Sequence, residues 1–154
     1  MIVSCCMKRN VIFISAEASV QHAVELVIKH HIGTLPVVDQ ADKLIGVVDL
    51  KNLLSLVMPD FVSLVDNLDF LMDFGAFEQR LPSREDLCRK VQEIMANPIA
   101  VKEKSSLLHA AAVLHQHGLK DLPVVTDKGV LVGLVSHVDI GSALMESWKI
   151  ISPE

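Results

Sequence analysis

Apolar residues along the chain change from strand-like runs to a helical stripe and back, and this order of patterns occurs twice. The β-branched run VIFI at residues 11–14 predicts a short strand, and Ser19 can cap the helix that follows. That helix carries its apolar residues at helical spacing on one face: Val20, Ala23, Val24, Val27 and Ile28. LPVVD from Leu35 and LIGVVD from Leu44 indicate buried strands joined by a polar turn, and a closing helix is expected from about Leu50.

The second copy of this pattern starts near residue 99. Pro36 aligns with Pro123 at a shift of 87 positions (123 − 36 = 87), and the neighbouring elements keep this shift. Only upstream is one residue of slippage needed, where residues 7–11 correspond to 95–99. Neither copy alone is large enough to bury both faces of its sheet, so we expect the two to pack about a pseudo-twofold axis. The cleft between them is the expected functional site.

The segment between the copies has no counterpart in the duplicated pattern. Its first part carries a helical stripe of apolar residues: Phe61, Leu64, Val65, Leu68, Leu71 and Met72. Ser83 can cap a second helix with Leu87, Val91, Ile94 and Met95 on one face. We therefore divide the chain into repeat 1 at residues 1–58, a helical insert at 59–94 and repeat 2 at 95–154. The insert covers either this chain's own core or a homodimer interface, or it is a docking surface for another protein.

Composition and charge exclude several classes of protein. The chain has 154 residues, 51% of them apolar, which is enough for two small units with a shared core. Polar residues interrupt every apolar stretch before the roughly 18 residues of a membrane-spanning helix, and the start does not resemble a secretory signal. Three cysteines, two of them adjacent, fit a reducing compartment, so we expect a cytoplasmic protein. The net charge of −5 and the absence of tyrosine argue against binding to DNA or RNA polymers.

Two stretches carry a resemblance to a known family, HAVELVIKHHIGTLPVVDQADKLIGVVDLKNLL from His22 and HAAAVLHQHGLKDLPVVTDKGVLVGLVSHVDIGSAL from His109. Together they resemble a tandem pair of CBS domains, the cystathionine-β-synthase motif, also called a Bateman module. The resemblance implies an α/β (α+β) fold with two βαββα repeats that share a cleft. It also implies a homodimer and an adenosyl ligand such as AMP, ADP, ATP or S-adenosylmethionine, with no cofactor required.

In that family the ligand-contacting pattern is glycine, an apolar residue, any residue, Ser or Thr, two more residues, and Asp. The second copy fulfils it with Ser136 and Asp139, and His137 lies between them. A carboxylate accepts two hydrogen bonds from a ribose diol, while a hydroxyl at a helix N-terminus suits a phosphate. The adenine is expected against the two preceding segments of this copy: Ile99, Ala100, Val101, Leu119, Lys120, Asp121 and Pro123. The spacing of Ser136 and Asp139 is also close to that of a helix capping box, although Glu or Gln is the preferred partner of the serine, and the two roles are compatible.

The first copy departs from the pattern at both polar positions. Asp49 stands where the hydroxyl is expected, and its charge disfavours a phosphate, while Asn52 is a neutral substitute for the ribose carboxylate. An unphosphorylated adenosyl group is still compatible with this site. We therefore predict one good nucleotide site and a second, weaker one formed by the first copy: Val11, Ile12, Gly33, Thr34, Pro36, Asp49 and Asn52.

The seven histidines do not have the spacing of a metal site, because His115 and His117 lie two positions apart and His30 and His31 are adjacent. His31 stands where the other copy has Gly118, so we expect it in a left-handed conformation. Phosphate-binding loops and hydrolase motifs are absent, which predicts no catalytic residues. The sequence therefore favours a non-catalytic regulatory module that binds an adenine nucleotide. The alternatives are an interaction scaffold with vestigial clefts and a partner-binding insert, and a metal sensor that uses the histidines.

Overall fold

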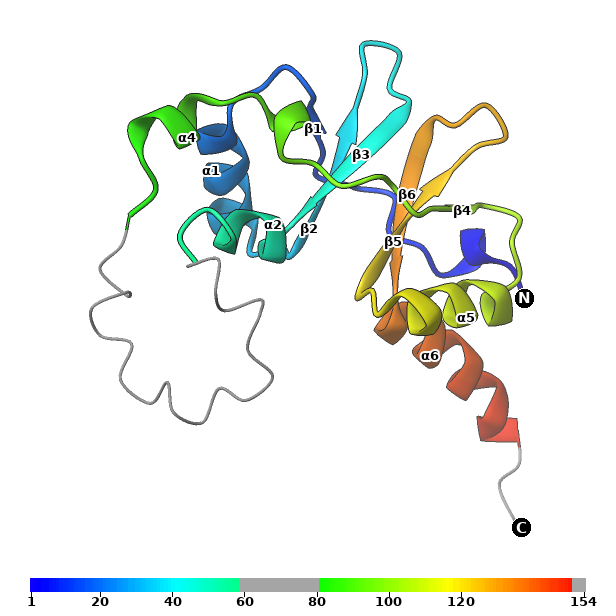
Figure 1. The fold of residues 1–154 in the computed structure, drawn as a ribbon. Coiled ribbons are helices and arrows are strands. Elements are labelled where there is room, and N and C mark those ends of the chain that lie inside the picture. The colour runs from blue at the N-terminus through cyan, green and yellow to red at the C-terminus, as the bar shows by residue number, and fades with distance from the viewer. Residues whose placement is uncertain (59–80, 151–154) are drawn as a thin grey trace, which may run out of the picture.

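Two three-stranded sheets, each with its own helices, make up the part of the chain that the computed structural model describes, residues 1–58 and 81–150 (Figure 1). In the first sheet β2 lies in the centre, parallel to β1 and antiparallel to β3. The elements of this repeat are β1 (Ile14–Ser15), α1 (Val20–His30), β2 (Thr34–Val38), β3 (Leu44–Asp49) and α2 (Leu50–Leu54).

The second sheet repeats this arrangement in the order β4, β5, β6, with the same parallel and antiparallel pairs. Its elements are β4 (Val101–Lys102), α5 (Leu107–His117), β5 (Asp121–Val125), β6 (Leu131–Ser136) and α6 (His137–Glu146). All begin 87 positions after their counterparts, as β5 does after β2 (121 − 34 = 87). The predicted fold class, with two βαββα repeats, is confirmed.

The first helix of each repeat begins and ends at equivalent residues. The Ser19 hydroxyl accepts a hydrogen bond from the backbone N–H three residues on, at 3.2 Å, and Ser106 does the same at 3.1 Å. These are N-caps, which satisfy backbone donors that the first helical turn leaves free. α1 ends at His31 with φ 55° and α5 at Gly118 with φ 60°. The left-handed conformation expected of His31 is therefore confirmed.

Each core is completed by a segment that precedes the other repeat. A short 3-10 helix η1 (Val3–Cys5) packs into the second core, and its counterpart η4 (Val91–Glu93) packs into the first. The Val3 N–H donates to the Ser105 carbonyl at 2.9 Å, and the Val91 N–H donates to the Ala18 carbonyl at 2.8 Å. Val3 and Val91 are fully buried. The two repeats thus exchange their leading segments.

The first strand of each repeat is shorter than the apolar runs predict. Val11 and Ile12 precede β1, and Ile99 precedes β4. These residues follow segments that pair with the opposite sheet, since the Lys8 N–H donates to the Leu134 carbonyl of β6 at 2.8 Å. The β-branched runs therefore form connections between the two sheets, and only their ends join a strand.

The predicted insert at residues 59–94 is described only from residue 81 onward, and its first predicted helix lies outside the described residues. α4 (Arg84–Cys88) begins after Ser83, as predicted, but it is shorter than expected. It ends because Arg89 takes an extended conformation with φ −59° and ψ 153°. Val91 lies beyond this break, in η4. The last described helix is η5 (Ser147–Ile150), which follows α6.

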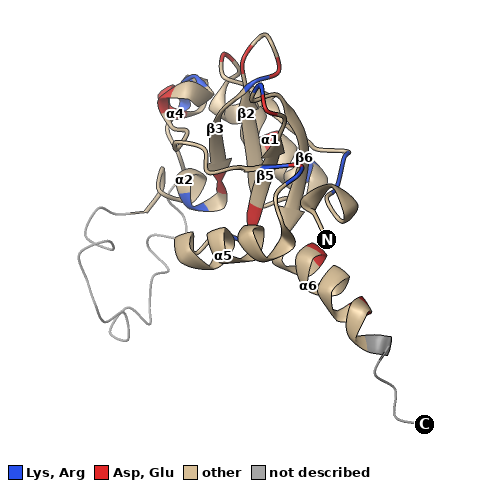
Figure 2. Cartoon of the chain, turned by 90° about the vertical axis from the view of Figure 1, so that its right-hand side faces the viewer, with Lys and Arg blue, Asp and Glu red and all other residues tan. Residues whose placement is uncertain are grey.

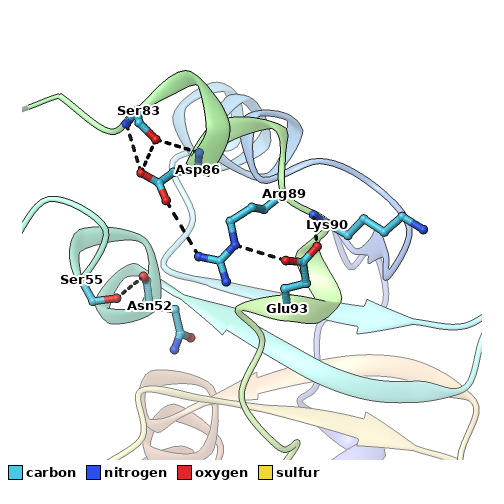
Figure 3. Close-up of polar contacts among 7 residues, drawn as sticks. All are labelled: Asn52, Ser55, Ser83, Asp86, Arg89, Lys90 and Glu93. Atoms are coloured by element: carbon cyan, nitrogen blue, oxygen red, sulfur yellow. Dashed lines mark hydrogen bonds and ion pairs between the residues drawn. The ribbon is translucent and has the colours of Figure 1, made fainter.

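Polar side chains form a network within the segment around α4, as Figure 3 shows. The Ser83 hydroxyl donates to the Asp86 carboxylate at 2.6 Å. Arg89 donates to Glu93 at 3.3 Å and lies 3.9 Å from Asp86. Lys90 forms an ion pair with Glu17 of the first repeat. This network positions the chain where it enters η4.

Candidate ligand sites between the two repeats

A hydrogen bond joins the two repeats at their pseudo-twofold axis. Thr34 begins β2, and its equivalent Asp121 begins β5. The Thr34 hydroxyl donates to the Asp121 carboxylate at 3.0 Å. Both residues line two cavities, one on each side of this bond. The bond therefore forms a shared wall between the cavities.

The first cavity has a volume of about 290 Å³. Its wall joins the β3–α2 junction of the first repeat to the start of β5 in the second. The lining residues are Gly33, Thr34, Val47, Asp49, Leu50, Lys51, Ala96, Asn97, Ile99, Gly118, Leu119, Lys120, Asp121 and Pro123. The volume is near the lower end of typical small-molecule sites.

The second cavity has a volume of about 260 Å³ and lies on the other side of the axis. It combines the connection before β1 and the end of α1 with β6 of the second repeat. The lining residues are Lys8, Asn10, Val11, Ile12, His31, Ile32, Gly33, Thr34, Asp121 and Leu134. Leu134 lies on β6, two residues before Ser136 at the end of that strand.

The cavities group the predicted site residues differently from the sequence. Ile99, Leu119, Lys120, Asp121 and Pro123 share the first cavity with Asp49, although they were placed with Ser136 and Asp139. Val11, Ile12, Gly33 and Thr34 line the second cavity together with Leu134 of β6. The physical reason is the exchange of leading segments, which carries the connection before each first strand across to the opposite sheet.

Several predicted residues line neither cavity. Val101 and Pro36 are buried, and Val101 belongs to the second core. His137 is exposed at the start of α6. Four others are partly buried: Ala100, Asn52, Ser136 and Asp139.

Ser136 and Asp139 form a complete capping box at the start of α6. Asp139 Oδ2 accepts from the Ser136 N–H at 2.9 Å and from the Ser136 hydroxyl at 2.6 Å, and the Asp139 N–H donates to the hydroxyl at 3.2 Å. The capping role is therefore confirmed. No hydrogen bond within the described residues uses Asp139 Oδ1.

Lys8 is a residue of this junction that the sequence analysis missed. Its ammonium group lies 3.5 Å from Asp139 Oδ2, and its side chain is 63% exposed while that of Asp139 is 15% exposed. Lys8 also lines the second cavity, which links Asp139 to that cavity. Burial and then the Asp139 charge raise the pKa of the nearby Cys6 thiol, so the thiol stays protonated at neutral pH. The residue equivalent to Lys8 in the other repeat is Ala96, so a comparison of the two repeats does not indicate a role for Lys8.

The equivalent junction of the first repeat has a neutral partner in its capping box. The Asp49 N–H donates to Asn52 Oδ1 at 3.0 Å, and the Asn52 N–H donates to Asp49 Oδ1 at 2.8 Å. Asparagine at this position thus maintains the same cap as Asp139. Asp49 lines the first cavity and places a carboxylate there.

Residues 1–58 and 81–150 contain neither a metal-binding cluster nor a helix that could span a membrane. No group of three or more His, Cys, Asp or Glu side chains is arranged there to hold a metal ion. None of the helices in this part of the chain is both long enough and apolar enough to cross a membrane.

Comparison with known proteins identifies the family of the duplicated unit. The model described as CBS domain matches residues 3–59 and again residues 91–146. The CBS domain-containing protein CBSX1, chloroplastic, of Arabidopsis thaliana is 27% identical over 146 residues, which cover 90% of this chain and 61% of CBSX1. The chain thus spans less than two thirds of that relative.

Solved structures share the whole described architecture. The crystal structure of CBSX2 in complex with AMP has a TM-score of 0.71 at 25% identity and covers 96% of this chain and 98% of that chain. The CBS domain pair of protein MJ0100, in complex with 5-methylthioadenosine and S-adenosyl-L-methionine, has a TM-score of 0.68 at 21% identity, with coverage of 96% and 98%. The latter shows similarity of fold alone. With two matches to one family model, the chain belongs to the CBS domain family and is a tandem CBS pair.

Proposed function

We propose that this CBS pair is a non-catalytic regulatory module that binds an adenine nucleotide in the second cavity. The observation that carries the proposal is the Asp139 carboxylate, whose side chain is 15% exposed and which forms an ion pair with Lys8, a residue that lines this cavity. CBSX2, which is 25% identical and has the same fold, is known in complex with AMP.

The cavity offers a different group for each part of a nucleotide. Val11, Ile12 and Ile32 supply apolar contacts for the base, and the backbone at Gly33 supplies polar groups for its edge. Asp139 Oδ1 accepts from the ribose diol, while Oδ2 keeps the helix cap. A phosphate would face the N-terminus of α6, where backbone N–H groups favour an anion.

The first cavity is proposed as the weaker site. Asp49 places a carboxylate where the other repeat has the Ser136 hydroxyl, and a carboxylate repels a phosphate. Asn52 replaces the ribose-binding carboxylate and already accepts the hydrogen bond of its cap. An unphosphorylated adenosyl group fits this chemistry better than a nucleotide.

The regulatory output is proposed to be a change in the pairing of two copies through α5 and α6. α5 contains no Lys, Arg, Asp or Glu, so its ribbon has neither blue nor red in Figure 2. Exposed apolar residues lie on α5, α6 and the following η5: Leu108, Val138, Met145 and Trp148. Exposed apolar patches mark interaction surfaces. A ligand changes such pairing only if it binds the two states with different affinity.

The deciding experiment is calorimetric titration of the full chain with AMP, ADP, ATP and S-adenosylmethionine, with sedimentation of the same samples. Replacing Asp139→Asn should weaken binding of the preferred nucleotide about tenfold or more, because a charge-assisted hydrogen bond contributes about 1.5–3 kcal/mol. The melting temperature without ligand should stay nearly constant, since Asn52 shows that asparagine maintains this cap.

Asp86→Asn is the matched control. Asp86 accepts from the Ser83 hydroxyl at 2.6 Å, as Asp139 does from Ser136, but it lies on α4 and lines neither cavity. This control should bind like the unmodified chain. Equal affinity of the Asp139→Asn variant would refute the role of Asp139. If no ligand of the panel binds, the module is instead a scaffold for another protein.

A further inference from the structure

The two cavities differ in where their basic side chains lie. Lys8 and His31 line the second cavity. The pseudo-symmetric positions in the first cavity are Ala96 and Gly118, which have no basic group. The first cavity instead has Lys120, at the position of Gly33, and Lys51, together with the Asp49 carboxylate. The two cavities thus carry their basic groups at different positions. Asp121 lines both of them, and only the first has the additional carboxylate of Asp49.

His31 occupies its position against the preference of its own backbone. Its φ of 55° lies in the left-handed region, which glycine adopts more easily than histidine. The other repeat ends α5 at this position with Gly118 at φ 60°, so the helix end itself does not require an imidazole. The last turn of α1 already contains Lys29 and His30 to complement the helix dipole. The His31 side chain is exposed toward a cavity and takes no part in either core.

We propose that Lys8 and His31 make the second cavity selective for phosphorylated adenosine over adenosine itself. Both side chains donate hydrogen bonds, and the lysine ammonium adds positive charge, which suits phosphate oxygens. Lys8 reaches this cavity from the exchanged leading segment, which pairs with β6, whereas His31 lies at the end of α1. The proposed selectivity therefore depends on both of these segments. The inference rests on the proposed nucleotide site and names the residues that choose its ligand.

Calorimetric titration of the full chain with AMP and with adenosine tests this selectivity. The unmodified chain should bind AMP at least tenfold more tightly than adenosine. His31→Gly should reduce this ratio about threefold to tenfold, with the adenosine affinity unchanged. Lys8→Gln should reduce the ratio by a similar factor, and the ratio itself is its readout because Lys8 also pairs with Asp139. His31→Gly should also raise the melting temperature by about 2–4 °C, because glycine fits the left-handed backbone. If His31 had a purely structural role, His31→Gly would not raise the melting temperature and at the same time lower the affinity for AMP.

Asp42→Gly is the matched control for the backbone effect. Among the described residues other than glycine, only His31 and Asp42 have a positive φ, and that of Asp42 is 57°. Asp42 lies on a turn and does not line the second cavity. The Asp42→Gly variant should likewise have a higher melting temperature, while its ratio of AMP affinity to adenosine affinity stays constant.

Two results would overturn the proposal in different ways. If adenosine and AMP bind the unmodified chain equally, or if both variants keep the original ratio, the selectivity is wrong while the nucleotide site stands. If the unmodified chain binds neither compound, the proposed site fails, and the role of Lys8 and His31 fails with it.

Discussion

Two glycines on the last strands of the sheets make room for methionines from the exchanged segments. A Cβ atom on Gly133 would lie 2.6 Å from the Met7 sulfur and 3.2 Å from the Lys8 carbonyl oxygen. Gly46 is in the same relation to Met95, and a side chain there would collide with that methionine. Glycine in a strand interior often marks such a close approach. The absence of a side chain is thus what lets each leading segment lie against the opposite sheet.

Gly133→Ala should destabilise the fold by about 1–3 kcal/mol, because the added methyl group overpacks the contact with Met7. Urea unfolding measures this change. In a double-mutant cycle, Gly133→Ala should cost less free energy of unfolding when Met7 is already alanine than when Met7 is present. Gly141→Ala is the control, since its Cβ would meet only Met145 at 4.0 Å. If Gly133→Ala costs no stability, the close packing is not required.

At the scale of elements, the short helix α4 and the turn η4 are fixed by their polar groups. Ser83 and Asp86 satisfy the first turn of α4, and Arg89 connects Asp86 to Glu93. The hydrogen bonds from Ser83 lower the pKa of the Asp86 carboxyl, and those from Lys90 and Arg89 lower that of Glu93. Since both side chains lie at the surface, solvent screens these interactions.

Ser83→Ala should raise the pKa of Asp86 toward its ordinary value, because the hydroxyl donor is lost. A carboxyl whose pKa is lowered on folding contributes stability above its unfolded pKa. That contribution disappears as the pH falls through the folded pKa, so α4 should fray in acid. NMR titration of the side-chain carboxyl carbons measures both effects. An Asp86 pKa that does not respond to the substitution would contradict this origin of the shift.

At the scale of the whole molecule, the two repeats are joined at both ends of their sheets. The Thr34–Asp121 hydrogen bond lies at one end. At the other, the hairpin turns pair, with the Leu44 N–H donating to the Gly129 carbonyl and the Leu131 N–H donating to the Asp42 carbonyl, both at 3.0 Å. The cavities lie beside the first of these joints, so its bond affects the walls of both.

Thr34→Val keeps the shape of the side chain and removes the donor to Asp121. It should destabilise the chain by about 1–2 kcal/mol, because a partly buried carboxylate loses a partner. Hydrogen exchange should become faster in β2 and β5. Thr34→Ser retains the hydroxyl and should behave like the original residue. If the valine variant exchanges like the unmodified chain, the bond does not hold the repeats together.

The sequence predicted the elements well because their causes are local. Ser19 caps α1, Ser83 caps α4 and His31 ends α1 in the expected conformation. The grouping of the site was not predictable in the same way. Val3 and Val91 are equivalent valines, so apolar patterns alone do not say which core each one fills. Only the three-dimensional structure shows that they exchange, and that Lys8 comes to lie beside Asp139.

The exchange of leading segments has a consequence for how such a molecule can be divided or duplicated. A chain with a single repeat would complete its core only by exchanging its leading segment with that of a second identical chain. Two such chains would have identical cavities, and every substitution would appear in both. In a tandem pair the exchange of leading segments takes place within one polypeptide. The two repeats are therefore always present in equal number, and their sequences can diverge. Ala96 and Gly118 line one cavity, whereas Lys8 and His31 line the other, and two identical repeats could not carry such differences.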